Sequence, residues 1–424
     1  MTVEQALDYI HSVSWMGSRP GLGRTRELLS LMGNPQNKLR FVHVAGTNGK
    51  GSTCAMIASI LKQAGYKVGL YTSPYILRFN ERMQINGEEI ADEELAEITE
   101  YIKPFAESME DHPTEFELVT AIGFEYFARQ HCDIVVLEVG LGGELDSTNV
   151  IESAVLSVIT EIDFDHMGVL GNTVEEIAAA KAGIIKSGVP VVSADNLPVA
   201  AKVVDDACKI KGSLHITPEF DKVKDKRATE DGISFSYMGV DYKVPLMGEY
   251  QYRNALMAIT AATILKKLNF SISDTQIAEG LASVKWAGRF EKLCSDPVFI
   301  YDGGHNPQGV AAAVKTFSKR FGKGVVLIGV MADKDYGAEI KTLLPVAEKF
   351  VTVTPSNSRA LPAKELAQKI FFAGGDAYSA STVEEGVSMA AELAAGKMPI
   401  FALGSLYMYG EIKGAVEKLF LQKR

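Results

Sequence analysis

The stretch FVHVAGTNGKGS, residues 41–52, decides the fold of this 424-residue chain. An apolar strand runs into a turn with three glycines and one lysine, and a helical pattern begins at Ser52. Glycines let the backbone turn so that N–H groups face phosphate oxygens, and a helix amino end adds partial positive charge. Lys50 offers a charge to the outer phosphates. We predict a nucleotide-binding loop made of Gly46, Thr47, Asn48, Gly49, Lys50, Gly51 and Ser52.

This loop departs from the strict P-loop pattern at two positions. Val44 stands where the first glycine belongs, and Gly51 separates Lys50 from Ser52. The alternative is an ordinary strand-to-helix turn that happens to contain glycine and lysine. The order of strand, loop and helix favours nucleotide binding.

Strands and helices alternate on both sides of the loop. Nearly unbroken apolar strands separated by helices are typical of a parallel sheet that is covered on both faces. We expect strands at 41–46, 67–73, 133–140, 154–160 and 190–194, with helices at 52–64, 116–129 and 174–186.

The pattern of polar and apolar residues changes after residue 230. Alternating polar and apolar residues around Gly239 predict a hairpin of strands 233–238 and 241–246, followed by a long amphipathic helix at 251–267. A second α/β series starts near residue 286, with strands at 298–302, 324–330, 350–354 and 399–403. We predict an α/β protein with a P-loop domain at 1–286 and a smaller Rossmann-like α/β domain at 287–424.

Composition narrows the function classes. Apolar residues make up 47% and charged residues 23%, as in ordinary globular proteins, and no apolar run is long enough for a bilayer. Residues 1–13 read as an amphipathic helix and not as a secretion signal, and the four scattered cysteines form no CxxC pair, so we expect reduced thiols and a cytoplasmic protein. A net charge of −10 argues against nucleic-acid binding but leaves anionic small molecules open.

Acidic residues stand where apolar strands end. Glu138 lies within an apolar run, where an unpartnered carboxylate is costly to bury. Mg²⁺ beside the phosphate loop is one partner, and a hydrogen-bonded structural acid is the alternative. Asp163, Asp165 and His166 cluster after the next strand, and Ser73 follows another. Ser73 alone would be read as a turn serine.

The loop GTNGKGS resembles that of Mur ligases and, with glycine after the lysine, that of folylpolyglutamate and dihydrofolate synthases. Further similar segments follow in the right order along nearly the whole chain, namely SPYILRFNER (73–82), TEFE (114–117) and YDGGHNP (301–307). The resemblance implies a Mur-ligase-like ATP-binding domain followed by a glutamate-ligase domain, with ATP and two Mg²⁺ ions at the site.

The resemblance also implies residue roles. Lys50, Lys181 and His305 would be catalytic, and Lys181, otherwise an ordinary solvated helix lysine, would be carbamylated beside the second metal. Ser73, Glu138 and His166 would bind the metals. Nucleotide contacts would include Asn254, Arg289 and Asp302. Folate would be lined by Thr114, Glu115, Phe116, Glu117, Leu145, Asp146 and Ser147, and glutamate would be bound by His305 and Ser405.

Several of these residues also have a purely structural interpretation. Thr114 and Glu117 fit a helix N-cap and its capping box. Arg289 could be a surface arginine, and residues 301–307 could be an Asx-rich turn closed by proline.

The implied activity is ATP-dependent ligation of L-glutamate to the terminal γ-carboxylate of a folate through an acyl phosphate. Glu144 stands where family members that act as dihydrofolate synthases often carry arginine, and Tyr75 replaces a frequent histidine. Both differences favour a dedicated glutamate-adding enzyme over a dihydrofolate synthase or a bifunctional one. A Mur enzyme of wall synthesis and a non-catalytic nucleotide-binding regulator remain alternatives. We expect a monomer that binds neither nucleic acid nor membrane.

Overall fold

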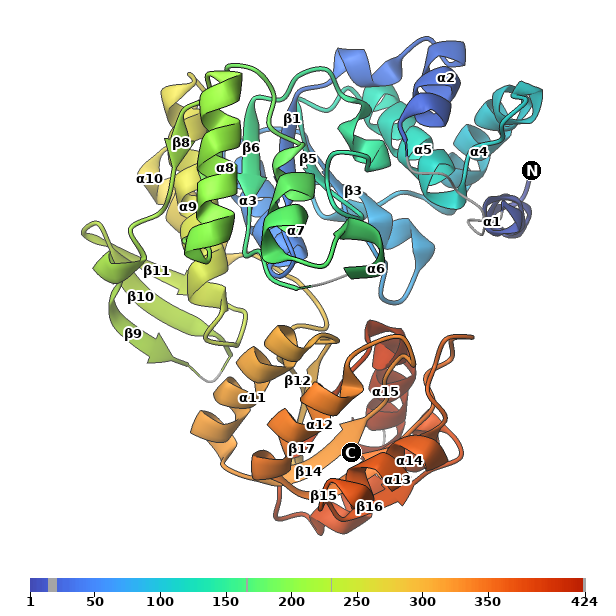
Figure 1. Ribbon diagram of the computed structural model, residues 1–424, viewed down its shortest axis with the longest axis vertical. Coiled ribbons are helices and arrows are strands. Elements are labelled where there is room, and N and C mark those ends of the chain that lie inside the picture. Colours follow the sequence, from blue (N-terminus) through green and yellow to red (C-terminus); the bar gives the residue numbers. More distant parts are fainter. Residues whose placement is uncertain (14–20, 165–166, 230, 422–424) are drawn as a thin grey trace. The chain divides into compact units, whose positions relative to one another are not determined.

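The computed structural model describes residues 1–13, 21–164, 167–229 and 231–421. The chain divides into two compact units. The first comprises Met1–Asp225, Phe235–Lys243 and Tyr252–Val284, and the second comprises Lys226–Ser234, Val244–Gln251 and Lys285–Arg424. Each unit contains its own sheet and covering helices, which confirms the α/β class (Figure 1).

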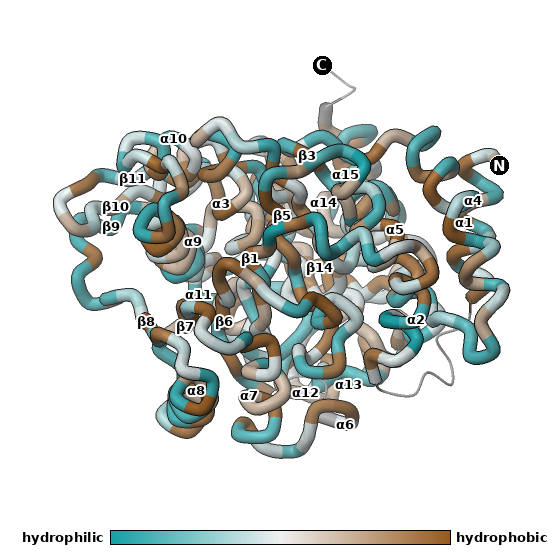
Figure 2. The backbone as a smooth tube through the Cα atoms, turned by 90° about the horizontal axis from the view of Figure 1, so that it is seen from above, coloured by the Kyte–Doolittle hydropathy of each residue, from teal (hydrophilic) through white to brown (hydrophobic). Residues whose placement is uncertain are grey.

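The first unit is built on an eight-stranded sheet in the order β4-β3-β2-β5-β1-β6-β7-β8. The strands from β2 to β8 run parallel as predicted, and β3 and β4 add an antiparallel edge. Their bounds are β1 (Phe41–Ala45), β2 (Val68–Tyr71), β3 (Met83–Ile85), β4 (Glu88–Glu89), β5 (Ile134–Glu138), β6 (Leu156–Ile159), β7 (Val191–Ser193) and β8 (His215–Ile216). All five residues of β1 and of β5 are buried, and both strands are largely hydrophobic in Figure 2.

Helices cover this sheet, and α3 packs on β1, β2 and β5. The helices of this half of the chain are α1 (Val3–Ser12), α2 (Gly23–Leu31), α3 (Lys50–Gln63), α4 (Asp92–Ser108), α5 (Glu115–Arg129), α6 (Met167–Leu170), α7 (Val174–Ala182), α8 (Pro198–Lys211), α9 (Gln251–Lys267) and α10 (Asp274–Ala282).

Two predictions about helices were wrong. The helix expected at 174–186 ends at Ala182, and the carbonyl of the next residue, Gly183, accepts a hydrogen bond from the Asn149 side-chain amide. Helix α9 has its expected bounds but is buried on almost every side, so it is not amphipathic. Its small residues Ala255, Ala258, Ala261 and Ala262 are all at most 1% exposed.

The predicted hairpin is present as β10 (Ile233–Tyr237) and β11 (Val240–Val244), and β9 (Lys224–Ala228) adds a third strand. Alternate residues of β10 are buried, as the sequence pattern indicated.

The second unit contains a six-stranded sheet in the order β12-β13-β17-β14-β15-β16. Only β12 is antiparallel to its neighbour among the described pairings. Phe317 and Phe401 stack in its core with ring centroids 4.5 Å apart. The elements are β12 (Glu291–Ser295), β13 (Val298–Asp302), α11 (Pro307–Phe321), β14 (Gly324–Ile328), α12 (Tyr336–Leu343), β15 (Ala347–Thr352), α13 (Ala363–Phe372), β16 (Ala377–Ser379), α14 (Val383–Ala394), β17 (Ile400–Leu403) and α15 (Tyr409–Val416).

All four cysteines are buried free thiols, as expected. Within the ranges that the structure describes, no helix is both long enough and apolar enough to cross a membrane.

Candidate active site

The glycine loop after β1 takes a conformation that only glycine fits well. Gly46 has φ +151° and Gly49 has φ +83°. A Cβ at Gly46 would lie 1.8 Å from Thr160 Oγ1, and one at Gly49 would lie 2.3 Å from Asn254 Oδ1. The side chains of Thr160 and Asn254 therefore lie directly against the loop. Asn254 is one of the residues predicted to contact the nucleotide.

Two lysines donate to the same carbonyl oxygen of this loop. Lys50 Nζ lies 3.0 Å from Gly46 O and 3.3 Å from Thr47 O, and Lys181 Nζ lies 2.9 Å from Gly46 O. Lys181 is only 3% exposed, so it is not the solvated helix lysine of the ordinary interpretation. Two ammonium groups on one oxygen repel each other strongly away from bulk water, and an anion between them would offset that repulsion.

The backbone N–H groups of the loop divide into two sets. Those of Thr47 and Asn48 both donate to Glu161 O, at 2.7 and 3.3 Å. Thr47 Oγ1 also exchanges hydrogen bonds with the backbone of Asp163, at 3.0 and 3.1 Å. Residues 47 and 48 therefore attach the loop to the segment after β6. The amides of residues 49–52 lie at the N-terminus of α3, where helix N–H groups have no acceptor within the helix.

Glu138 and Ser73 meet at the carboxyl ends of the neighbouring strands β5 and β2. Glu138 is 4% exposed, and its Oε2 accepts a hydrogen bond from Ser73 N at 3.1 Å, so the carboxylate has the partner that its burial requires. A carboxylate and a hydroxyl are hard oxygen ligands that suit Mg²⁺. His166, the third predicted ligand, and Asp165 lie outside the described residues. Within those residues no three His, Cys, Asp or Glu side chains converge.

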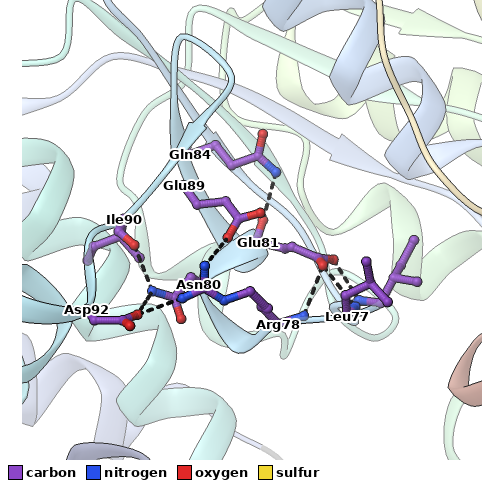
Figure 3. Close-up of polar contacts among 9 residues, drawn as sticks. Leu77, Arg78, Asn80, Glu81, Gln84, Glu89, Ile90 and Asp92 are labelled. Carbon is purple, nitrogen blue, oxygen red and sulfur yellow. Dashed lines mark hydrogen bonds and ion pairs between the residues drawn. The ribbon is translucent and has the colours of Figure 1, made fainter. Parts of the chain in front are cut away.

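The loop after Ser73 is held by one acid that the sequence did not single out. The Glu81 carboxylate accepts the backbone N–H groups of Ile76, Leu77 and Arg78 at 2.8, 2.8 and 2.9 Å (Figure 3). Asn80 Nδ2 donates to Ile90 O and to Asp92 Oδ1, at 2.7 and 2.8 Å. Asn80 thus binds this segment to the chain after β4 and to the start of α4, and Gln84 Nε2 of β3 donates to Glu81 O at 3.0 Å (Figure 3).

The predicted capping box of α5 is confirmed. Thr114 caps the helix, and Glu117 Oε2 accepts from Thr114 N at 2.7 Å. Glu117 is 3% exposed and also pairs with Arg24 Nε at 2.9 Å, while Glu115 lies 3.3 Å from His11 Nδ1. Both acids therefore have structural partners.

Phe116 packs α5 onto the chain that follows β5. A Cβ at Gly140 would lie 2.4 Å from Phe116 Cζ, so the ring lies directly against that chain. Helix α5 also contacts the 3₁₀ turn Ser147–Val150, so the two predicted folate segments, 114–117 and 145–147, belong to neighbouring elements of one unit. Leu145 at the turn is 53% exposed, which leaves an apolar side chain available to a ligand.

Asp146 organises the turn that contains Leu145 and Ser147. Its carboxylate accepts from Leu141 N at 2.8 Å, Thr148 N at 3.0 Å and the Thr148 hydroxyl. Burial raises the pKa of Asp146, and these donors lower it. Asn149 Nδ2 fixes the same turn by donating to Glu144 O at 2.9 Å.

In the second unit, Asp302 ends β13 and is 3% exposed. It accepts from Tyr250 Oη at 2.8 Å, Phe290 N at 2.9 Å and Gly304 N at 2.7 Å. Burial raises the pKa of Asp302, and the nearby Arg289 guanidinium lowers it. Tyr250 was not predicted to contact this acid, since the two are 52 residues apart.

Arg289, His305 and Ser405 lie near Asp302. A Cβ at Gly303 would be 2.6 Å from Arg289 Nη1, and His305 Nδ1 lies 3.0 Å from Gly303 O. Gly404 N donates to Gly304 O at 3.1 Å, which brings the residue before Ser405 to the same turn. The carboxyl ends of the paired strands β13 and β17 therefore gather all four predicted residues of this unit. Ser405 is 2% exposed and caps a short 3₁₀ turn through Tyr407 N.

Comparison with known proteins matches this arrangement to one family. Residues 44–262 match the Mur ligase middle domain, and residues 288–406 match the Mur ligase glutamate ligase domain. The dihydrofolate synthase/folylpolyglutamate synthase of Bacillus subtilis is 41% identical over 382 residues, which cover 86% of this chain and 87% of that protein.

Comparison with solved structures leads to the same family. A Mycobacterium tuberculosis folylpolyglutamate synthase complexed with ADP and AMPPCP has a TM-score of 0.88 at 28% identity, covering 99% of this chain and 98% of that one. An FPGS–AMPPCP–folate complex has a TM-score of 0.86 at 33% identity, covering 99% and 100%. The chain therefore belongs to the folylpolyglutamate synthase and dihydrofolate synthase family of Mur ligases.

Proposed function

We propose that this protein uses ATP to join L-glutamate to the terminal γ-carboxylate of a folate. The observation that carries the proposal is the convergence of Lys50 and Lys181 on the Gly46 carbonyl, in the sheet that also brings Ser73 and Glu138 together. This is a site for a polyanion and a divalent cation. A similar structure holds both AMPPCP and folate, which supports these two substrates.

The donor set suits magnesium. Ser73 and Glu138 would hold one ion, and His166 is proposed as a ligand of a second. Mg²⁺ supplies positive charge that offsets repulsion between a carboxylate and the triphosphate. We further propose that Lys181 is carbamylated. Carbamylation would replace one of the two ammonium groups that share the Gly46 carbonyl by an anion, and so would remove the repulsion between them.

The chemistry requires two transfers. The γ-phosphate of ATP passes to the folate carboxylate and gives an acyl phosphate, which the glutamate amine then attacks with loss of phosphate. Lys50 and the amides of residues 49–52 stabilise the charge of the transferring phosphoryl group. In this proposal Asn254, Arg289 and Asp302 bind the nucleotide, and His305 and Ser405 bind glutamate. Thr114–Glu117 and Leu145–Ser147 line the folate.

We favour glutamate addition to folate over dihydrofolate synthesis because of Tyr75 and Glu144. The Tyr75 ring packs on Phe79, with centroids 5.9 Å apart, and the Arg82 guanidinium lies 5.1 Å from the Tyr75 centroid. A histidine at position 75 would not make the same ring contacts with Phe79 and Arg82. The Bacillus subtilis relative is named for both activities, so the bifunctional alternative is retained. We also propose a cytoplasmic monomer.

The test incubates the purified protein with Mg·ATP, L-glutamate and either tetrahydrofolate or dihydropteroate, and measures ADP and product mass. We expect ADP release that depends on both glutamate and tetrahydrofolate, with a product longer by one glutamyl residue. Product from dihydropteroate would establish the bifunctional alternative. ADP formed without either acceptor, or no turnover with any, would overturn the proposal, and the second result would favour a non-catalytic regulator.

A further inference from the structure

A buried chain of polar groups runs from β1 to the turn that carries Asp146. His43, in the middle of β1, is 0% exposed, and its Nε2 lies 2.9 Å from Thr148 Oγ1. Thr148 is also 0% exposed, and its hydroxyl donates to Asp146 Oδ1. The three residues span 105 positions of sequence, and neither His43 nor Thr148 has a role in the chemistry described above.

The direction of these hydrogen bonds is fixed by what each group can donate. The single hydroxyl proton of Thr148 goes to the Asp146 carboxylate, so Thr148 must accept its other bond from the N–H of His43. Burial, reinforced by the Lys186 charge, lowers the pKa of His43 to about 3, so the ring is neutral with its proton on Nε2. Nδ1 has no hydrogen-bond partner among the residues described.

This geometry gives His43 a specific task. Without the histidine N–H, the Thr148 hydroxyl would be free to rotate away from the carboxylate, and Asp146 would lose a donor that stabilises its charge. The remaining backbone donors to Asp146, which are the N–H groups of Gly140, Leu141 and Thr148, would still hold the turn. The expected defect is therefore one of orientation and charge at Asp146, with the turn itself retained.

We propose that His43 is a positioning residue that acts through Thr148 to hold the Asp146 carboxylate in place, within the turn that is proposed to line the folate. This inference rests on the proposed function, since it takes Asp146 as part of the folate pocket. His43 lies three residues before Gly46, so a single strand supports both the phosphate loop and the acceptor pocket. Only the acceptor pocket, however, is expected to depend on the His43 side chain.

The experiment compares four variants by steady-state kinetics with tetrahydrofolate, ATP and glutamate. Thr148→Val removes the hydroxyl at nearly constant volume, and Thr148→Ser keeps it. His43→Leu removes the donor, and the double variant combines His43→Leu with Thr148→Val. Thermal melts confirm that each variant is folded.

We expect KM for folate to rise about tenfold in Thr148→Val and His43→Leu, the size of one lost bond to a charged group. KM for ATP should change less than about twofold. Thr148→Ser should behave as the wild type, and the double variant should be no worse than Thr148→Val alone, since both changes break one chain.

Several results would overturn this inference. Equal rises in KM for ATP and folate would show a general structural role. Additive effects in the double variant would show that His43 does not act through Thr148, and an unchanged folate KM in folded Thr148→Val would exclude the chain altogether. If His43→Leu does not fold, the Thr148 pair still decides. A wild-type protein that does not use folate would instead refute the proposed function, which the same assay shows separately.

Discussion

At the residue scale, the Gly46 carbonyl oxygen accepts hydrogen bonds from Lys50 and Lys181. These two side chains give the phosphate loop its positive charge. Each ammonium is oriented by the carbonyl, but one carbonyl cannot neutralise two positive charges. Bound triphosphate and the proposed carbamylation of Lys181 would each supply the missing negative charge. The loop is therefore expected to depend on these side chains for nucleotide binding more than for folding.

Lys50→Met tests that dependence. Mg·ATP at a hundredfold excess over its Kd should stabilise the wild type by about 2.7 kcal/mol, and the variant should lose most of this stabilisation. Thermal melts with and without Mg·ATP measure the effect. Lys62→Met, an exposed position on the same helix, is the matched control and should keep the full shift. A Lys50→Met protein that ATP stabilises as well as the wild type would contradict the assigned role.

Glu339 in α12 is a buried ionisable group with a measurable effect on stability. It is 0% exposed, and neither carboxylate oxygen has a hydrogen-bond partner within the described residues. Burial raises the pKa of Glu339 to about 8, with Lys334 lowering it and Asp335 raising it. The folded protein therefore holds the proton more tightly than the unfolded chain, in which the pKa is near 4.5.

Stability from the Glu339 proton is fully present below pH 4.5 and is lost as pH rises toward 8. Glu339→Gln should flatten this decline and raise the melting temperature at pH 8 relative to the wild type. Melts between pH 5.5 and 8.5 measure it, with the exposed Glu392→Gln as control. Parallel pH curves for wild type and Glu339→Gln would show that Glu339 is not a buried neutral acid.

At the element scale, the segment between β2 and β3 owes its shape to Glu81. Three consecutive backbone N–H groups point at one carboxylate (Figure 3). Phe79 anchors the end of this segment in the core, but Leu77 is 49% exposed, so residues 76–78 depend on the Glu81 carboxylate for their position. The polar contacts therefore determine where the chain runs after Ser73.

Glu81→Ala should loosen this segment and weaken the metal site that begins at Ser73. We expect a several-fold rise in the Mg²⁺ concentration needed for half-maximal activity, because an oriented ligand set is lost. Glu81→Gln keeps one acceptor oxygen for Leu77 and Arg78 and should fall between Glu81→Ala and the wild type. If Glu81→Ala requires no more Mg²⁺ than the wild type, the segment does not support the metal ligand.

The sequence predicted long elements well and short ones poorly. Apolar runs located β1, β2, β5, β6 and β7, because a strand buried on both faces has no polar positions. The strands β3, β4, β8 and β16, each of two or three residues, were missed because so short a strand carries little pattern, whereas β7 is as short but lies within the longer apolar run 190–194. The five-residue strands β9 and β12 were missed as well. Helix α7 was extended too far, because the contact of Asn149 with Gly183 O that accompanies its end is tertiary.

At the scale of the whole molecule, the resemblance to Mur ligases indicated which residues to expect at the site, but not which partners hold them. Lys181 and Gly46 are 135 positions apart, and no periodicity shows that one bonds to the other. His43, Glu81 and Tyr250 were missed for the same reason. Their partners lie on other elements or across a turn, and only the folded chain shows them.

The central claim is that the triphosphate and a divalent cation bind where the carboxyl ends of β1, β2 and β5 meet. The most direct test is a crystal structure with a non-hydrolysable ATP analogue and Mn²⁺ in place of Mg²⁺, located by its anomalous signal. We predict the triphosphate along residues 46–52 and a Mn²⁺ peak bound by the Ser73 hydroxyl and the Glu138 carboxylate. A triphosphate bound elsewhere, or a Glu138 carboxylate that faces no ion, would contradict it.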